Sequence, residues 1–147
     1  MRDVIRACHK VYEIKYHMCF VVKYRKDIFM KEKYAEHIKK IMLEIEKRYY
    51  ISAETIGFDE DHVHILVQAA PRYSPSRVIQ ITKSITAREM FNEFPEIKKE
   101  LWGGEFWGDG GYIATVGEGS NAGVIRNYIK KQGGKGEQLR LIDFAEP

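Results

Sequence analysis

Two histidines separated by a single residue, His62 and His64, have the types and spacing that could bind a metal ion. They belong to the segment 62–69, in which apolar residues alternate with the two histidines and predict a β-strand. Residues i and i+2 of a strand share one face, so the two imidazoles lie side by side with Cα atoms about 6.6 Å apart. Two imidazoles at this spacing can converge on one cation. The same pattern also describes two partly exposed histidines on an ordinary strand.

A tyrosine and a glutamine near the end of the chain form the second candidate pair. Tyr128 and Gln132 are four residues apart, which places them on one face of a helix. Asn121 is predicted to cap this helix, and the glycines at 133 and 134 are predicted to end it. A tyrosine hydroxyl can act as a nucleophile once it is activated. With nine tyrosines in the chain, however, Tyr128 is equally well explained as a packing side chain.

The segments that position these pairs follow from the periodicity of apolar residues. Val63, Ile65 and Val67 point away from the two histidines, so we expect them to face the core. If two helices cover that core face, the histidines lie on the opposite face, and the helix with Tyr128 must lie there too. The predicted elements are strands at 11–25, 50–58, 62–69 and 112–116 and helices at 32–48, at 75–94 after the N-cap Ser74, and from 121 onward.

This order, β-α-β-β-α-β-α, predicts an α+β fold in a single domain covering residues 1–147. Its first six elements correspond to the ferredoxin-like split βαβ arrangement, an antiparallel sheet with two helices on one face. The final helix is an addition that carries Tyr128.

Composition narrows the class of protein. The 44% hydrophobic and 31% charged residues are typical of a globular domain, and only two cysteines, Cys8 and Cys19, argue against a disulfide framework. No apolar run or signal sequence predicts a membrane partner, so we expect a soluble cytoplasmic protein. The absence of a P-loop motif argues against a nucleotide cofactor. A net charge of +3 is a weak indication of an anionic partner.

Together, the two histidines and the late Y-x-x-x-Q helix resemble the HUH superfamily, and more closely the single-tyrosine transposases of the insertion-sequence-200/605 type. The similarity covers almost the whole chain and includes residues 23–26, 61–64 and 106–117. It implies that Tyr128 attacks single-stranded DNA and forms a 5′-phosphotyrosine. It also implies that His62, His64 and Gln132 bind Mg²⁺ or Mn²⁺. Asp61 is not a ligand in the family pattern, although its carboxylate could orient an imidazole.

The resemblance also implies partners. It predicts a homodimer with shared active sites, in a prokaryotic, nucleoid-associated protein, although from the residues alone the tyrosine helix could serve its own chain or the partner. The resemblance also implies single-stranded or hairpin DNA as the substrate, whose phosphates Lys and Arg would hold and whose unpaired bases would stack on aromatic side chains. Trp102, Phe106 and Trp107 are expected to pack rather than to stack on bases. The predicted DNA-contact residues are Lys23, Tyr24, Arg25, Arg72, Lys83, Arg88, Arg126, Lys130 and Lys131.

Two alternative functions remain open at this point. A related HUH enzyme that has been domesticated by its host would nick single-stranded DNA with the same residues. A non-catalytic ferredoxin-like module would bind nucleic acid without a metal, as RNA recognition modules do with aromatic residues on their central strands. Here that face carries His62 and His64 instead.

Overall fold

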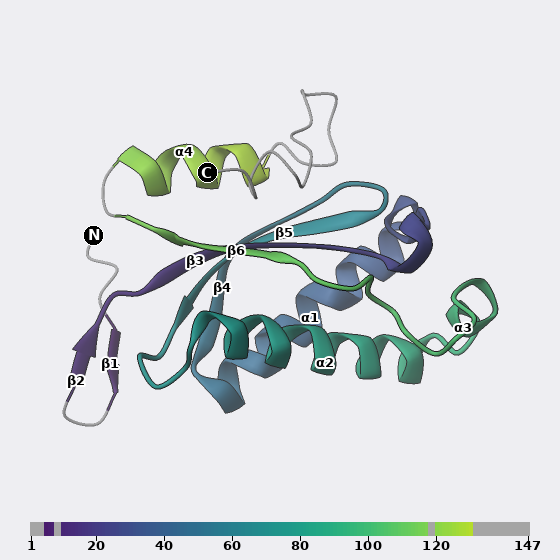
Figure 1. The fold of residues 1–147 in the computed structure, drawn as a ribbon, viewed down its shortest axis with the longest axis horizontal. Helices are drawn as coiled ribbons and strands as arrows, with labels where there is room; N and C mark the ends of the chain where they lie inside the picture. Colours follow the sequence, from purple (N-terminus) through teal and green to yellow (C-terminus); the bar gives the residue numbers. More distant parts are fainter. Residues whose placement is uncertain (1–4, 8–9, 118–119, 131–147) are drawn as a thin grey trace.

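A computed structural model describes residues 5–7, 10–117 and 120–130, with side chains described for residues 12–117 and 124–130. A four-stranded antiparallel sheet, in the order β4-β5-β3-β6, separates two long helices on one face from a third helix on the other (Figure 1). No described helix is long and apolar enough to cross a membrane. The strands are β3 (Lys15–Val21), β4 (Ile51–Phe58), β5 (His62–Ala69) and β6 (Tyr112–Val116), and the helices are α1 (Glu32–Tyr49), α2 (Pro75–Glu93) and α4 (Ser120–Lys130).

These main elements confirm the predicted α+β fold. The series β3-α1-β4-β5-α2-β6 is the split βαβ arrangement, and α4 is the additional C-terminal helix. Ser74 is the predicted N-cap of α2, since its Oγ accepts a hydrogen bond from the backbone N–H of Arg77 at 3.1 Å. Helix α4 begins at Ser120, one residue before the predicted cap Asn121, and its predicted end at residues 133–134 lies outside the described residues.

The predicted single strand at 11–25 is wrong. The structure divides this segment into β2 (Lys10–Tyr12), which pairs with β1 (Ile5–Ala7), and β3, which ends at Val21. A 3₁₀ turn, η1 (Lys23–Arg25), follows because Tyr24 and Arg25 adopt positive φ angles of 61° and 53°. A strand cannot continue through left-handed residues, so the alternation of apolar and polar residues continues beyond the true end of the strand. The remaining short elements are η2 (Ile28–Met30) and α3 (Ile97–Glu100).

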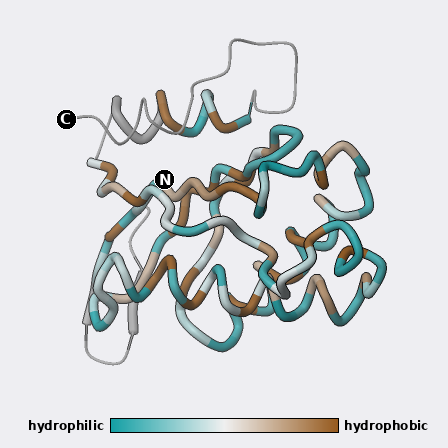
Figure 2. The backbone as a smooth tube through the Cα atoms, turned by 45° about the vertical axis from the view of Figure 1, so that its right-hand side comes forward, coloured by the Kyte–Doolittle hydropathy of each residue, from teal (hydrophilic) through white to brown (hydrophobic). Residues whose placement is uncertain are grey.

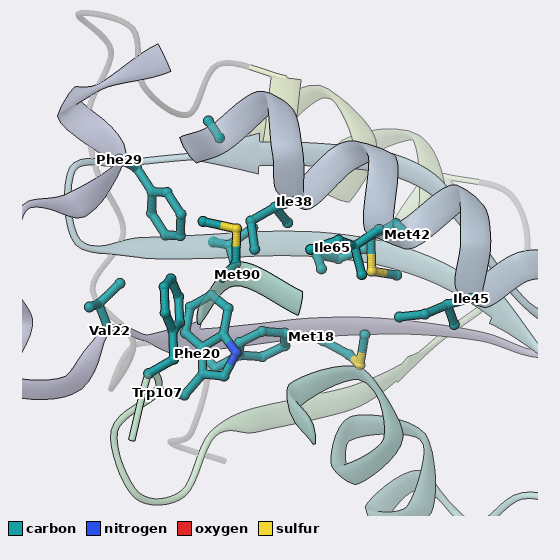
Figure 3. Packing of buried hydrophobic residues seen from close by; sticks show 14 of the residues in the cluster. Met18, Phe20, Val22, Phe29, Ile38, Met42, Ile45, Ile65, Met90 and Trp107 are labelled. Atoms are coloured by element: carbon teal, nitrogen blue, oxygen red, sulfur yellow. The ribbon is translucent and has the colours of Figure 1, made fainter. Parts of the chain in front are cut away.

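The hydrophobic core lies between the sheet and the pair α1 and α2. Met18 pairs with Ile65 and Phe20 with Val63, and all four side chains are at most 1% exposed. In Figure 3, Met18, Phe20 and Ile65 lie beside side chains of α1 and α2 and the indole of Trp107. On the opposite face, the coloured part of α4 carries both apolar and polar residues (Figure 2). Side chains alternate between the two faces of a strand, so the neighbours of the core residues on β3 and β5 point toward α4: His17, Cys19, His62 and His64.

Candidate active site

The two histidines of β5 lie together beneath α4. Their ring centroids are 5.0 Å apart and the rings meet at 73°. His62 is 7% exposed and His64 is 0% exposed, so the alternative of two partly exposed histidines on an ordinary strand does not apply. The reason is that α4 covers this face, whereas the sequence pattern describes only the strand. The expected placement opposite Val63, Ile65 and Val67 is confirmed, since those three residues lie in the core.

Tyr128 completes the site from α4. Its ring meets the ring of His64 edge to face, at an angle of 86° and with centroids 5.3 Å apart. Tyr128 is 64 positions from His64 and 66 from His62 along the chain, and the docking of α4 on β4 and β5 brings the three residues together. Gln132, the third predicted metal ligand, lies outside the described residues.

Glycine at position 57 allows α4 to approach the sheet. Gly57 pairs with His64 in the β4–β5 ladder. A Cβ atom at this position would overlap the carbonyl oxygen of Ile129 and lie 2.9 Å from its carbonyl carbon. Ile129 is fully buried. The helix backbone therefore rests directly on the strand beside His64, and this close approach requires glycine.

A charged pair on the same side also holds α4. Arg126 Nη2 lies 2.5 Å from Glu54 Oε1, with both side chains about 30% exposed. Glu54 also contacts Lys15, whose Nζ lies 3.5 Å from Oε2. This network joins α4 to β4 and β3, so it supports the position of the tyrosine helix.

Two carboxylates surround His62. Asp61 Oδ1 lies 2.7 Å from His62 Nδ1, which matches a hydrogen bond donated by the imidazole. On the other side of the ring, Asp59 Oδ2 lies 4.0 Å from Nε2. Asp59 Oδ2 and His62 Nε2 are both buried, and neither has a hydrogen-bond partner among the described residues. With Nδ1 protonated toward Asp61, Nε2 presents its lone pair inside the site.

His17 is a residue of this site that the sequence analysis missed. Its Nε2 lies 3.1 Å from Nδ1 of His64, and the two rings stack at 24° with centroids 5.3 Å apart. Cys19, the cross-strand partner of His64, has its sulfur 3.8 Å from Nε2 of that ring. Alternation along β3 already places His17 on the polar face. The missing signal was the pairing of β3 with β5, which no local pattern reveals.

Burial keeps these imidazoles neutral. It lowers the pKa of His17 to about 4. The pKa of His64 is also lowered, chiefly by burial and then by the neighbouring His17 and His62. A neutral imidazole has a lone pair available for a metal ion or for a hydrogen bond.

The donors present suit a divalent cation. The unpartnered Nε2 of His62 and the neutral ring of His64 are nitrogen ligands that transition metals accept. Among the described residues, no group of three or more His, Cys, Asp or Glu side chains is arranged to hold a metal ion. A third protein ligand therefore has to come from another residue type or from outside the described segments.

Comparison of the sequence with known proteins matches the chain to one family. The family described as Transposase IS200 like matches residues 10–132, which include both histidines, Tyr128 and Gln132. The chain belongs to the IS200-like transposase family.

Individual members of the family extend the match to nearly the whole chain. The ISDra2 transposase TnpA of Deinococcus radiodurans is 34% identical over 122 residues, covering 83% of this chain and 86% of that protein. The transposase for insertion sequence element IS200 of Salmonella typhimurium is 31% identical over 146 residues, covering 96% and 93%. Transposases as a class cleave and rejoin DNA.

Solved structures agree on the fold. A crystal structure of a Deinococcus radiodurans R1 protein assigned as a transposase superposes with a TM-score of 0.67 at 28% identity, covering 88% of this chain and 98% of that one. A REP-associated tyrosine transposase bound to a REP hairpin has a TM-score of 0.59 at 7% identity, covering 86% and 72%. This second likeness supports the fold alone.

One of the basic residues predicted to contact DNA in this IS200-like transposase, Arg25, lies beside the histidines through its contact with Asp61. Arg25 is paired with Asp61 at 3.2 Å and its side chain is 70% exposed. Lys23 is paired with Glu105 at 3.2 Å. Lys130 is exposed at the end of α4, two residues beyond Tyr128. These positions suit contacts with a strand that enters the site, and the contacts stay predictions.

The other predicted contacts are placed differently. The Lys83 ammonium donates to the carbonyls of Gly108, at 2.9 Å, and Gly110, so it holds the loop before β6. Arg88 lines a groove between α1 and α2, on the sheet face opposite the histidines. Arg126 is engaged with Glu54, and Lys131 lies outside the described residues. The structure therefore does not bring Arg88 to the site.

Proposed function

We propose that this protein is a single-stranded DNA transposase that cleaves and rejoins its substrate through Tyr128. The observation that carries the proposal is the edge-to-face contact of Tyr128 with His64, 5.3 Å between centroids, beside a second histidine with an unpartnered ring nitrogen. A nucleophile and a pair of metal-ligating side chains thus meet on one sheet face. Membership of the IS200-like family supports the same reaction class.

His62 and His64, with Gln132, are the residues proposed to hold Mg²⁺ or Mn²⁺. When bound, a divalent cation polarises a phosphate oxygen and orients the phosphate for attack. Two neutral imidazoles and an amide add no negative charge to the cation they hold, so the bound ion would keep its attraction for a phosphate. Asp61 fixes the tautomer of His62 through Nδ1, and His17 fixes the orientation of His64 in the same way.

The proposed reaction is a transesterification at one phosphodiester. The Tyr128 hydroxyl oxygen attacks phosphorus and loses its proton, and the bond from phosphorus to the 3′ oxygen breaks. The products are a 5′-phosphotyrosine and a free 3′-OH, which takes up one proton. Attack by another 3′-OH reverses the step and joins strands, so no nucleotide cofactor is consumed.

The space for the substrate is proposed to lie next to His17. A cleft of about 230 Å³ opens between β6 and α4, and His17, Tyr112, Thr115 and Val124 are among the residues that line it. A single strand fits between a helix and a sheet edge more readily than a duplex does. We therefore propose single-stranded or hairpin DNA as the partner, with affinity that falls as salt rises.

A covalent-adduct assay tests this function. Single-stranded oligonucleotides from the DNA flanking the gene are incubated with the protein and Mg²⁺ or Mn²⁺, then separated on a denaturing gel. We expect a shifted protein–DNA band and a shortened strand, both absent in Tyr128→Phe. Tyr50→Phe is the matched control, because Tyr50 is 52% exposed directly after α1, which covers the sheet face opposite the histidines. An adduct that persists in Tyr128→Phe would assign the nucleophile elsewhere, and binding without any adduct would favour the non-catalytic module.

A further inference from the structure

An exposed aromatic pair, Tyr24 and Trp102, lies where β3 ends. The two rings are nearly parallel, at 28°, with centroids 5.4 Å apart. Trp102 is 71% exposed and Tyr24 is 51% exposed. Trp102, which the sequence predicts to pack rather than to stack on bases, packs against Tyr24 but keeps most of its surface exposed, while the adjacent Leu101, fully buried, anchors this segment. Phe106 and Trp107, by contrast, do pack as predicted.

The backbone holds this pair in place at a conformational cost. Tyr24 and Arg25 both have positive φ, which is unusual for a bulky residue and persists only where surrounding contacts fix it. The Tyr24 hydroxyl donates to the carbonyl of Trp102 at 3.1 Å, and the backbone N–H of Lys23 donates to the carbonyl of Phe106 at 2.8 Å. Gly103, at φ 106°, turns the chain directly after Trp102. Two segments about 80 positions apart are thus joined to present two stacked rings to solvent.

The pair is connected to the histidines by charged contacts. Arg25 follows Tyr24 and binds Asp61, whose other carboxylate oxygen contacts His62. The side chain of Arg25 remains 70% exposed, and Lys26 beside it is also exposed. Aromatic surface and positive charge thus occur together at the edge of the candidate active site. This combination suits a nucleic-acid strand, since bases stack on aromatic rings and phosphates bind Arg and Lys.

We propose that the Tyr24–Trp102 pair is a stacking site for one unpaired nucleobase of the DNA strand, with Arg25 and Lys26 binding the adjacent phosphates. The inference rests on the proposed function, because the ligand is the same strand that Tyr128 cleaves. The indole is the outer, more exposed ring, so an incoming base extends the existing stack. By binding the adjacent phosphate, Arg25 directs the DNA strand from the stacking site toward His62.

Tryptophan fluorescence provides a direct test. The chain has two tryptophans, and Trp107 is only 5% exposed, so quenching by a bound base reports on Trp102. The probes are a 20-nucleotide oligothymidylate and an abasic sugar–phosphate chain of the same length. We expect quenching by the oligothymidylate, little quenching by the abasic chain, and none by either in Trp102→Leu.

Affinity measurements separate stacking from a structural role. Trp102→Leu is expected to weaken oligothymidylate binding about tenfold and to leave binding of the abasic chain unchanged. Trp102→Phe should restore most of the loss, because it keeps an aromatic face. Leu43→Ala, at a 60% exposed apolar position on α1, is the matched control and should bind both probes as the parent does.

The outcomes distinguish this inference from the proposed function. Equal weakening on both probes, or no weakening in Trp102→Leu, overturns the stacking site even where the parent protein still forms the Tyr128 adduct. A parent protein that binds neither probe and forms no adduct overturns both. A Trp102 surface that binds a protein partner instead would leave both DNA affinities unchanged.

Discussion

Replacing Gly57 with alanine tests whether the close approach of α4 to β4 positions the nucleophile. The added Cβ would overlap the carbonyl oxygen of Ile129 and lie 2.9 Å from both its carbonyl carbon and its Cγ2. An ordinary carbon–carbon contact needs about 3.5 Å or more. Helix α4 must therefore move away from β4 by at least about 0.6 Å at these carbons, and by more at the oxygen.

The displacement is expected to reach Tyr128, the residue next to Ile129. A misplacement of about 1 Å in a reacting group costs about 100-fold in rate. We therefore expect Gly57→Ala to slow adduct formation roughly tenfold to 100-fold, measured in single-turnover assays with the oligonucleotide that the parent cleaves. Hydrogen exchange should also speed up at the amides of α4 while those of β3 and β5 stay protected.

A control variant separates the loss of this close approach from a general effect of replacing glycine with alanine. Gly108→Ala places a Cβ 3.4 Å from the carbonyl oxygen of Val21, an ordinary contact, so cleavage should be little changed. Gly57 lies inside strand β4, where alanine in place of glycine normally adds stability, by about 0.5–1 kcal/mol. A Gly57→Ala protein that cleaves at the parent rate with α4 equally protected would refute the argument that this close approach positions Tyr128.

Three further predictions concern protons, metal and subunits. Because burial lowers the pKa of His17 from 6.5 to about 4, the unfolded chain binds a proton that the folded chain excludes, and stability should fall as pH drops from about 6.5 toward 4. In urea unfolding of the metal-free protein, His17 alone should contribute a loss of about 2 kcal/mol at pH 5 relative to pH 8, and the lowered pKa of His64 should increase that loss; a flat profile would contradict the buried neutral imidazoles. Asp61→Asn should weaken Mn²⁺ binding about tenfold to 100-fold in calorimetry, and unchanged affinity would show that Asp61 does not orient His62. Mixing His64→Ala with Tyr128→Phe should restore partial cleavage if sites are shared between subunits; no recovery under proven subunit exchange would assign each site to one chain.

The candidate ligands on β5 could be found from sequence because the signal is local. Alternation of Val63, Ile65 and Val67 with the two histidines fixes which side chains face the core, and the structure confirms that division. Helical spacing likewise placed Tyr128 on a late helix. These inferences need only the geometry of one element at a time.

The contacts between elements could not be found in this way. His17 meets His64 only because β3 pairs with β5, and the histidines are buried only because Gly57 admits α4. The left-handed turn at Tyr24 has no sequence signal, since tyrosine seldom adopts positive φ. The stacking of Trp102 on Tyr24 depends on this turn, so it has no sequence signal either.

The core also determines the geometry of the site on the other face of the same strands. Side chains alternate with a period of two, so a slip of one residue between β3 and β5 would move His62 and His64 into the core and Val63 and Ile65 out of it. Burying two imidazoles there while exposing two apolar side chains would cost more free energy than the marginal stability of a folded domain can offset. The apolar face thus excludes the shifted register, and the same hydrogen-bond ladder holds Cys19 opposite His64. Ile65→Val should consequently lower stability by about 1 kcal/mol without moving the histidines, because it makes a small cavity but leaves the ladder intact.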